Sequence, residues 1–448
     1  MEISIRQLAF ASLWVSNTFF ILFILCVERK KPAFALSWIL TLIFLPAIGF
    51  VLYLFLGTNI AVKRHNTRKG SLISLGYSEK ISDDNDIDLF ITAKAKYRKL
   101  LDDIEAAEDS IHVLYFIIRN DRIGRLLLDL LLKKAKQGVE VRLLYDHAGC
   151  WFTPGRLFKP LSENGAQVRR FFPINLDNYL RINFRNHRKI VVIDGKIGYI
   201  GGMNIGEEYM ATSLSILPWR DTHLRLVGSA VQALQQRFLL DWCFSGKTDK
   251  FTDFETERFF PVVESGGKVK IKIVSSGPSS EAEAVKWSFL QMIYAAKRQI
   301  LIQTPYFVPD DSFMEALRIA AYSGVKIVIM APAKTDNYLA HKVSLSYLGE
   351  LLKAGVRVYF YPGFIHAKML VIDDKIVSIG SANLDMRSFS LNFETNALIY
   401  DTRLAKECVA VFAADMKNSQ PMLGETYQNR SVFVRVQEGV FRLLAPLL

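Results

Sequence analysis

The chain is poor in cysteine. Its 448 residues include four cysteines, Cys26, Cys150, Cys243 and Cys408, whose spacing forms no CxxC or CxH pair. Closely spaced cysteines and histidines are typical of structural zinc sites and of disulfide frameworks. The scattered positions therefore argue against both classes, and we expect all four side chains to be small buried apolar groups.

Acidic residues are also in deficit. The chain has 44 aspartates and glutamates against 56 lysines and arginines, a formal net charge of +12. This surplus favours polyanionic partners, either nucleic acid or an anionic membrane surface. Apolar residues make up 50% of the chain, which is high for a soluble enzyme. The length allows two or three domains, each with its own core.

Charge is absent from two long stretches near the N-terminus. Residues 8–27 and 33–56 contain no charged side chain, and each is long enough to cross a hydrocarbon core of about 30 Å as a helix. We therefore predict a transmembrane helical hairpin over residues 1–58. A cleaved signal peptide is the weaker alternative, because a second apolar stretch follows at once. Three basic residues in the hairpin loop against five on the other side slightly favour catalytic domains in the cytoplasm.

Polar and amphipathic segments flank the rest of the chain. Residues 59–88 have the composition of a linker. Basic residues cluster at 63–69, where contact with lipid phosphates and simple solvation explain them equally well. At the C-terminus, residues 431–448 alternate apolar and charged side chains. This segment fits an amphipathic tail on a membrane or one packed on the protein's own surface.

One eight-residue pattern, HxKxxxxD, occurs twice. Its first copy contains His187, Lys189 and Asp194, and the second contains His366, Lys368 and Asp373. The match continues downstream at equal offsets, with Gly201, Gly202 and Asn204 after the first copy and Gly380, Ser381 and Asn383 after the second. A single HxK triplet carries little information, whereas a double copy with a matched asparagine indicates a functional site.

The pattern predicts which side chains meet. Each HxK is followed by a short apolar run, residues 190–193 or 369–372, which is typical of a buried strand. Alternate residues of a strand share a face, so the histidine and lysine of each copy point into one site. Two such units face to face present two imidazoles, two ammonium groups and two amides. That set suits a phosphodiester, with one histidine attacking phosphorus and the other protonating the leaving oxygen.

The duplicated HxKxxxxD, followed by GGxN or GSxN, is similar to the motif of the phospholipase D superfamily. Within it the chain resembles the bacterial cardiolipin synthases. This resemblance extends to the segment 29–57, to the sequence Glu207-Glu208-Tyr209 after the first asparagine, and to the apolar C-terminal end. It covers essentially the whole chain, and the double motif is more specific for the superfamily than for the substrate.

The resemblance implies roles for the motif residues. His187 is the implied nucleophile, and His366 is the implied general acid, which later deprotonates the incoming alcohol. From the residues alone the two near-symmetric histidines remain interchangeable. Four side chains are implied to bind the phosphoryl oxygens: Lys189, Lys368, Asn204 and Asn383. No metal or other cofactor is expected, since the two ammonium groups supply the positive charge.

Carboxylates near each motif are expected to support the histidines. A reacting histidine needs its second ring nitrogen fixed, usually by a carboxylate or a carbonyl. Glu394 and Asp221 are the candidates, 28 residues after His366 and 34 after His187, and the resemblance implies carboxylates in this role. The motif aspartates Asp194 and Asp373 belong to the catalytic motif. They lie beyond the apolar strands, so we expect them to brace backbone or turn groups more than to transfer protons.

Strand and helix patterns alternate through both halves, which predicts an α/β fold with a mixed sheet. The similarity of residues 138–146 to residues 324–332 supports a true duplication. The expected fold is two tandem phospholipase D-like α/β sandwich repeats with pseudo-two-fold symmetry, preceded by the hairpin. We expect the repeats at 89–262 and 263–448.

These features predict a membrane-anchored cardiolipin synthase. Such an enzyme transfers a phosphatidyl group from one phosphatidylglycerol to another through a phosphohistidine and releases glycerol. The nearest alternative is a membrane-bound phospholipase D that forms phosphatidic acid, and transfer to another lipid acceptor is a variant. A nuclease would not explain the two uncharged stretches, so nucleic acid is not the expected partner. A non-enzymatic scaffold would have at least one damaged motif. A homo-oligomer is left open.

Overall fold

The computed structural model describes residues 5–28, 32–53, 80–174, 183–210, 219–246, 258–263, 265–278, 282–442 and 445. The predicted hairpin loop at 29–31 and the basic cluster at 63–69 lie outside the described residues, as does most of the predicted linker. The chain divides into two compact units. One comprises Met1–Ile73 with Phe172–Phe184, and the other comprises Ser74–Phe171 with Arg185–Leu448.

The first unit contains a group of helices at the N-terminus. They are α1 (Ile5–Phe23), the π-helical turn η1 (Ile24–Glu28), α2 (Pro32–Phe44) and α3 (Pro46–Leu52). Pro46 separates α2 from α3, because proline has no amide hydrogen and its ring excludes the carbonyl four residues earlier. That carbonyl, of Leu42, accepts a hydrogen bond from Asn17 Nδ2 at 3.1 Å, and the same nitrogen lies 3.1 Å from Pro46 O.

The described helices differ from the predicted transmembrane hairpin. Within the ranges given above, no helix combines the length and apolar character needed to cross a membrane. The first apolar stretch changes from α- to π-helix at Ile24, and the second is broken at Leu45. Cys26 of this unit is exposed, so the prediction of burial is wrong for Cys26, whereas it is confirmed for the other three cysteines.

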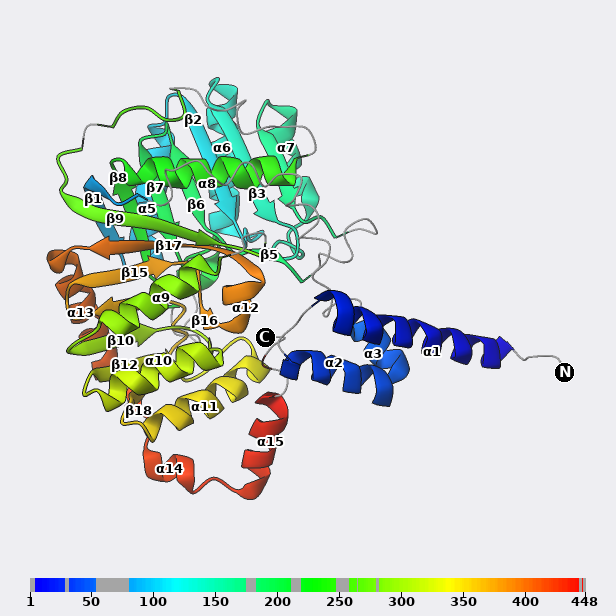
Figure 1. Cartoon of the computed structure of the whole chain (residues 1–448). Helices are drawn as coiled ribbons and strands as arrows, with labels where there is room; N and C mark the ends of the chain where they lie inside the picture. Colours follow the sequence, from blue (N-terminus) through cyan, green and yellow to red (C-terminus); the bar gives the residue numbers. More distant parts are fainter. Residues whose placement is uncertain are drawn as a thin grey trace. The chain divides into compact units, whose positions relative to one another are not determined.

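The second unit is built from two halves with the same order of elements (Figure 1). The main elements of the first half are β1 (Ser82–Phe90), α5 (Ala93–Glu105), β2 (Ser110–Tyr115), α6 (Arg122–Lys136), β3 (Glu140–Asp146), α7 (Lys159–Glu163), β4 (Gln167–Phe171), β5 (Arg185–Asn186), β6 (Ile190–Ile193), β7 (Ile197–Gly201), β8 (His223–Val227) and α8 (Ala230–Ser245). Strand β1 begins inside the predicted linker, so the linker ends earlier than residue 88.

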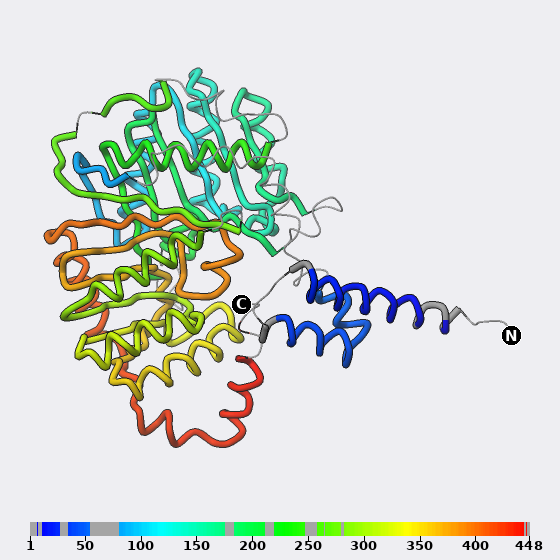
Figure 2. Tube along the Cα trace, in the orientation of Figure 1, coloured from blue at the N-terminus to red at the C-terminus, as the bar shows by residue number. Residues whose placement is uncertain are grey.

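The second half repeats this pattern and adds helices at its end. Its elements are β9 (Val269–Ser276), α9 (Ala284–Ala295), β10 (Gln299–Gln303), β11 (Phe307–Val308), α10 (Asp311–Tyr322), β12 (Lys326–Pro332), α11 (Tyr338–Leu352), β13 (Arg357–Tyr361), β14 (Met369–Ile372), β15 (Ile376–Gly380), β16 (Leu384–Asp385), α12 (Met386–Ser390), β17 (Asn392–Tyr400), α13 (Thr402–Lys417), β18 (Gln420–Pro421), α14 (Gly424–Gln428) and α15 (Val432–Arg442). In the trace of Figure 2 the two halves lie side by side, the first in cyan to green and the second from yellow-green onward.

The described strands join the halves in one 16-stranded mixed sheet. Outward from the centre, the first half runs β1-β8-β7-β6-β2-β3-β4 and the second runs β9-β17-β15-β14-β10-β12-β13. The two orders match strand for strand, which confirms the α/β class and the tandem duplication. Strands β1 and β9 pair antiparallel at the centre, with Ser82 opposite Ile271 and Asn85 opposite Val269.

Each half has its own hydrophobic core against the shared sheet. Strands β2, β6 and β14 are buried along their whole length, as expected where helices cover both faces of a sheet. Helix α8 lies across the strands of the first half in Figure 1, and α9 and α10 lie over those of the second. The motif strands β6 and β14 are thus interior strands that fix the residues at their ends.

The two motif aspartates stabilise turns at the far ends of these strands. Asp194 follows β6 and its carboxylate accepts hydrogen bonds of 2.8–3.3 Å from the backbone amides of residues 108–110. Asp373 follows β14 and accepts bonds of 2.8 Å from the amides of residues 297–299. Both aspartates have φ of +51°. They brace backbone, as expected, and their place among the catalytic residues stays a prediction.

We predict that Asp194→Ala lowers the free energy of unfolding by roughly 2–4 kcal/mol. Backbone amides lose a charged acceptor, and alanine tolerates positive φ poorly. Denaturant unfolding of the full chain measures the change. Asp129→Ala, on the exposed face of α6, is the control and should stay within about 0.5 kcal/mol of the parent. Loss of activity at unchanged stability would show instead that Asp194 acts in the chemistry.

Candidate active site

The two histidine segments lie at the centre of the second unit, and each is attached to the opposite half. His187 follows β5, which pairs in parallel with β17 of the second half. Its backbone amide donates to Phe393 O at 3.0 Å, and the amide of His366 donates to Arg220 O at 2.7 Å. Each motif histidine therefore lies beside the chain segment that carries the other half's carboxylate.

His187 is paired with Glu394 of β17. Its Nδ1 atom lies 3.0 Å from Glu394 Oε1 and 3.2 Å from Oε2. Glu394 is fully buried, and it also accepts from Ser381 Oγ at 2.5 Å and from Asn392 Nδ2 at 3.2 Å. A carboxylate at Nδ1 fixes the ring and leaves Nε2 as the nitrogen available for reaction.

His366 is paired with Asp221 of the first half. Its Nδ1 atom lies 2.6 Å from Asp221 Oδ2 and 3.3 Å from the Tyr209 hydroxyl. Asp221 Oδ1 accepts from the amide of Thr222 at 2.6 Å. The two carboxylates singled out from the sequence are thus both beside histidines, but each serves the histidine of the opposite half. Counting along each half could not show this exchange, which arises from backbone pairing across the centre.

One glycine after the first motif, Gly202, makes room for the carboxylate of Asp221. A Cβ atom on Gly202 would lie 2.2 Å from Asp221 Oδ1, and one on Gly201 would lie 2.5 Å from the Cα atom of His223. In the second copy Ser381 occupies the position of Gly202, and its hydroxyl is the donor to Glu394. The first copy therefore has glycine where Asp221 fills the space, and the second has serine where a hydroxyl donates to Glu394.

Both motif lysines are buried beside their histidines. Lys189 Nζ donates to His187 O at 2.5 Å, and Lys368 Nζ donates to His366 O. Burial lowers the pKa of Lys189 to about 7 and that of Lys368 to about 8, while the charge of Glu394 opposes the shift at both. The charge of Lys368 lowers the pKa of Lys189 further. The lysines are thus partly charged near pH 7, and a bound anion favours their protonation.

The histidines are neutral near pH 7 in the empty site. Burial lowers the pKa of His366 to about 3, an effect that the charge of Lys368 increases and Asp221 opposes. Burial also lowers the pKa of His187, against the effect of Glu394. A neutral imidazole is the nucleophilic form. A phosphodiester anion among these groups stabilises the protonated form of His366 that can donate to a leaving oxygen.

The two motif asparagines have different surroundings. Asn204 Oδ1 accepts from the amide of Ile117 at 3.3 Å, and its Nδ2 donates to the Tyr209 hydroxyl at 3.1 Å. Asn383 lines a pocket, and its buried Oδ1 has no hydrogen-bond partner in the described part of the chain. Asn204 therefore contacts Tyr209, whose hydroxyl in turn contacts His366. Asn383 instead faces the space beside His187.

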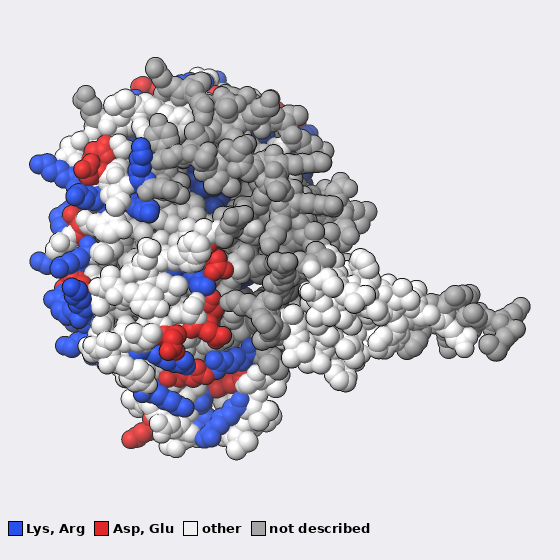
Figure 3. Space-filling model, in the orientation of Figure 1, with Lys and Arg blue, Asp and Glu red and all other residues white. Residues whose placement is uncertain are grey.

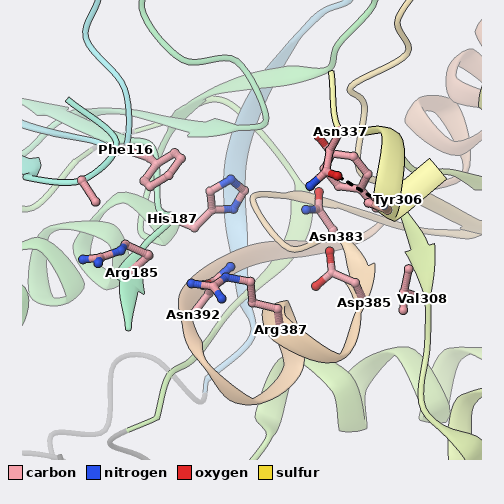
Figure 4. A pocket seen from close by; sticks show the side chains of 12 residues that line it. Phe116, Arg185, His187, Tyr306, Val308, Asn337, Asn383, Asp385, Arg387 and Asn392 are labelled. Carbon is pink, nitrogen blue, oxygen red and sulfur yellow. Dashed lines mark hydrogen bonds between the residues drawn. The ribbon is translucent and has the colours of Figure 1, made fainter. Parts of the chain in front are cut away.

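This space is a pocket of about 340 Å³ that reaches His187 (Figure 4). Phe116 and Arg185 line it on the side of His187, and Asn383 and Asp385 face them from the second half. The ring of Phe116 meets the His187 imidazole edge-on, with centroids 5.0 Å apart. The pocket thus gives access to His187, and its lining is partly apolar and partly charged.

Two charged residues that line this pocket, Arg185 and Asp385, were not predicted from the sequence. A signal existed, because side chains two residues apart share a face of an extended chain. Arg185 stands two residues before His187, and Asp385 stands two residues after Asn383. Extending each motif by one such step would have found both. Arg387, one step further, also lines the pocket.

Comparison with known proteins gives one family for most of the chain. The family described as "Cardiolipin synthase, PLD-like domain" matches residues 100–242 and 289–416, and "Phospholipase_D-nuclease N-terminal" matches residues 13–57. The major cardiolipin synthase of Bacillus subtilis (strain 168) is 40% identical, with 99% of this chain and 100% of that protein covered. A cardiolipin synthase of Staphylococcus aureus (strain Mu50) is 41% identical, with 98% and 96% covered.

Solved structures share the fold at low identity. A phosphatidylserine synthase from Haemophilus influenzae Rd KW20 superimposes with a TM-score of 0.63 at 14% identity, covering 87% of this chain and 100% of that one. A polyphosphate kinase from Porphyromonas gingivalis gives 0.51 at 12% identity, covering 80% and 52%. At these identities the similarity shows the α/β fold and does not extend to the activity.

We predict that each carboxylate substitution changes only the histidine of the opposite half. Glu394→Gln should alter the ring ¹⁵N resonances of His187, and Asp221→Asn should alter those of His366, because each removes the negative charge at Nδ1. Histidine-labelled protein provides the measurement, with His187→Asn and His366→Asn for assignment. Glu425→Gln, an exposed site on α14, should change neither. A shift within the same half would contradict the crossed pairing.

We predict that the site loses affinity for an oxyanion as pH rises from about 6 to 9. Lys189 and Lys368 lose their protons near pH 7 and 8, whereas ordinary lysines would stay charged over this range. Titration calorimetry with tungstate, a tetrahedral dianion, measures the loss. Lys368→Met should remove the upper part of the pH dependence. Lys375→Met, at an exposed turn, should leave it intact, and a flat profile in the parent would contradict the lowered pKa values.

Proposed function

This chain belongs to the cardiolipin synthase family of phospholipase D-like proteins, and we propose that it joins two phosphatidylglycerol molecules to form cardiolipin and glycerol. The observation that carries the proposal is the complete double site. Two buried imidazoles are each held by a buried carboxylate, and a buried lysine lies beside each. Both copies thus retain the histidine and lysine on which phosphodiester exchange depends, and each histidine has its carboxylate.

In the first step the donor phosphodiester binds between the two histidines. His187 Nε2 attacks phosphorus, the bond from phosphorus to the glycerol oxygen breaks, and His366 gives a proton to that oxygen. Glycerol leaves, and the phosphatidyl group remains covalently bound to His187. Glu394 at Nδ1 stabilises the positive charge that develops on the His187 ring.

In the second step the headgroup hydroxyl of another phosphatidylglycerol approaches. His366, now neutral, accepts the hydroxyl proton as the oxygen attacks phosphorus, and the bond from phosphorus to His187 breaks. The ammonium groups of Lys189 and Lys368 neutralise charge on the phosphoryl oxygens in both steps. One phosphodiester is exchanged for another, so the reaction is close to balanced and follows substrate abundance.

We further propose that the protein acts at a membrane. Apolar side chains of the first unit are strongly exposed, including Val15, Phe19 and Phe44 at 62–75%. Such exposed apolar surface marks contact with lipid or another apolar partner. The apolar side chains of α15 at Val432 and Phe433 are also exposed. Anionic lipid is favoured by the net charge of +12, and Figure 3 shows lysines and arginines along one edge of the second unit.

We predict that the full-length protein in phosphatidylglycerol vesicles produces cardiolipin and glycerol in about equal amounts. His187→Ala and His366→Ala should each lower the rate by a factor of about 10³ or more, because each step uses both imidazoles. Chromatography of the lipids and an enzymatic assay of glycerol measure the products. His341→Ala, at a half-buried histidine on α11 that belongs to neither motif, serves as the matched control.

The products distinguish the alternatives. Phosphatidic acid without cardiolipin would show that water resolves the phosphohistidine and would identify a phospholipase D. A mixed product when phosphatidylethanolamine is added would show a broader acceptor range. No turnover of any lipid would contradict the proposed activity.

A further inference from the structure

The proposed reaction brings two anions to one site. The donor phosphate lies at the histidines, and the acceptor phosphatidylglycerol carries a phosphate of its own. In the acceptor a three-carbon glycerol separates this phosphate from the attacking primary hydroxyl. The second phosphate must therefore lie several ångströms from the reacting phosphorus, where positive charge is needed to offset the repulsion between the two phosphates.

The pocket beside His187 carries such charge. Arg185 lies two residues before His187 and is buried, and Arg387 belongs to α12 of the second half. In Figure 4 the Arg387 side chain extends toward the wall that carries His187 and Arg185. The two arginines thus come from different halves and line one cavity that reaches His187.

The electrostatics of this pair favour an anion. Burial lowers the pKa of both arginines, and the charge of Arg185 lowers that of Arg387 further, against the effects of Asp385, Asp146 and Glu394. The repulsion that Arg185 exerts on Arg387 is reduced when an anion binds near both side chains. The planar guanidinium of each arginine matches two phosphate oxygens at once.

The same pocket offers acceptors for hydroxyl groups. Asn383 Oδ1 and Asn392 Oδ1 are buried, and neither has a hydrogen-bond partner in the described ranges. Asp385 lines the same cavity, with one carboxylate oxygen accepting from the amide of Ser388 at 2.6 Å. Buried acceptors without protein donors are able to accept hydrogen bonds from the hydroxyl groups of a ligand. The pocket therefore offers both cations and hydroxyl acceptors.

We propose that this pocket is the acceptor headgroup subsite, in which Arg185 and Arg387 bind the phosphate of the second phosphatidylglycerol while Asn383 and Asp385 orient its glycerol hydroxyls. The proposal rests on the proposed function and names its specificity determinants. Binding the acceptor phosphate here delivers the primary hydroxyl toward the phosphatidyl group on His187. The same contacts hold one phosphate of the cardiolipin product.

The test compares two acceptors in one vesicle assay with the full-length protein. Cardiolipin formation reports transfer to an anionic acceptor, and incorporation of labelled free glycerol into phosphatidylglycerol reports transfer to a neutral one. Arg387→Gln should lower cardiolipin formation by about 10–100-fold, the size expected for a charge-assisted contact. Glycerol exchange should stay within about twofold, because it needs no second phosphate. Arg403→Gln, at an exposed position on α13, should change neither rate.

Other outcomes overturn the proposal. Equal losses with both acceptors would place Arg387 at the donor phosphate, and no loss with either would exclude it from the subsite. If Arg387→Gln does not fold, Arg387→Lys gives the same comparison with a smaller selective loss expected, since lysine keeps the charge without the planar fork. Failure of the unmodified protein in both assays would contradict the proposed function itself, which separates that failure from failure of the subsite.

Discussion

The backbone bonds that tie each histidine segment to the opposite half are the constraint on which the site depends. His187 N donates to Phe393 O and His366 N donates to Arg220 O, and these contacts bring each histidine to the other half's carboxylate. The shared sheet, joined at β1 and β9, holds the halves in the required register. Any movement of one half relative to the other would separate both acid–imidazole pairs at once, so the rigidity of the sheet is part of the chemistry.

Burial gives the assembled groups their reactivity. Excluded from water, the imidazoles remain neutral and the ammonium groups are held with lowered pKa values. The empty site therefore carries less positive charge than its composition suggests, and binding of an anionic phosphodiester supplies the interaction that restores protons. Substrate binding and proton supply are coupled in this way, because the anion that is to react also favours the acid form of His366.

The sequence predicted the α/β duplication and the residues at the centre, because period-two spacing and a repeated motif are local patterns. It also predicted that Asp194 and Asp373 lie away from the histidines. The exchange of Glu394 and Asp221 could not be predicted, since it depends on strands paired across the two halves. The break at Pro46 was overlooked because a count of uncharged residues gives no weight to a missing amide. Asn204 and Asn383 look equivalent in sequence, and only their neighbours, Tyr209 and the pocket, distinguish them.

The crossed pairs also bear on how such a chain could arise. An isolated half would contain a histidine, a lysine and a carboxylate, but the carboxylate would lie beside a partner's imidazole and not its own. A complete site would then form only when two copies associate about a two-fold axis. Joining two copies in one polypeptide makes the association independent of concentration and lets the copies diverge. Gly202 with Asp221 on one side, and Ser381 with Glu394 on the other, are the divergence that an ancestral homodimer could not have had.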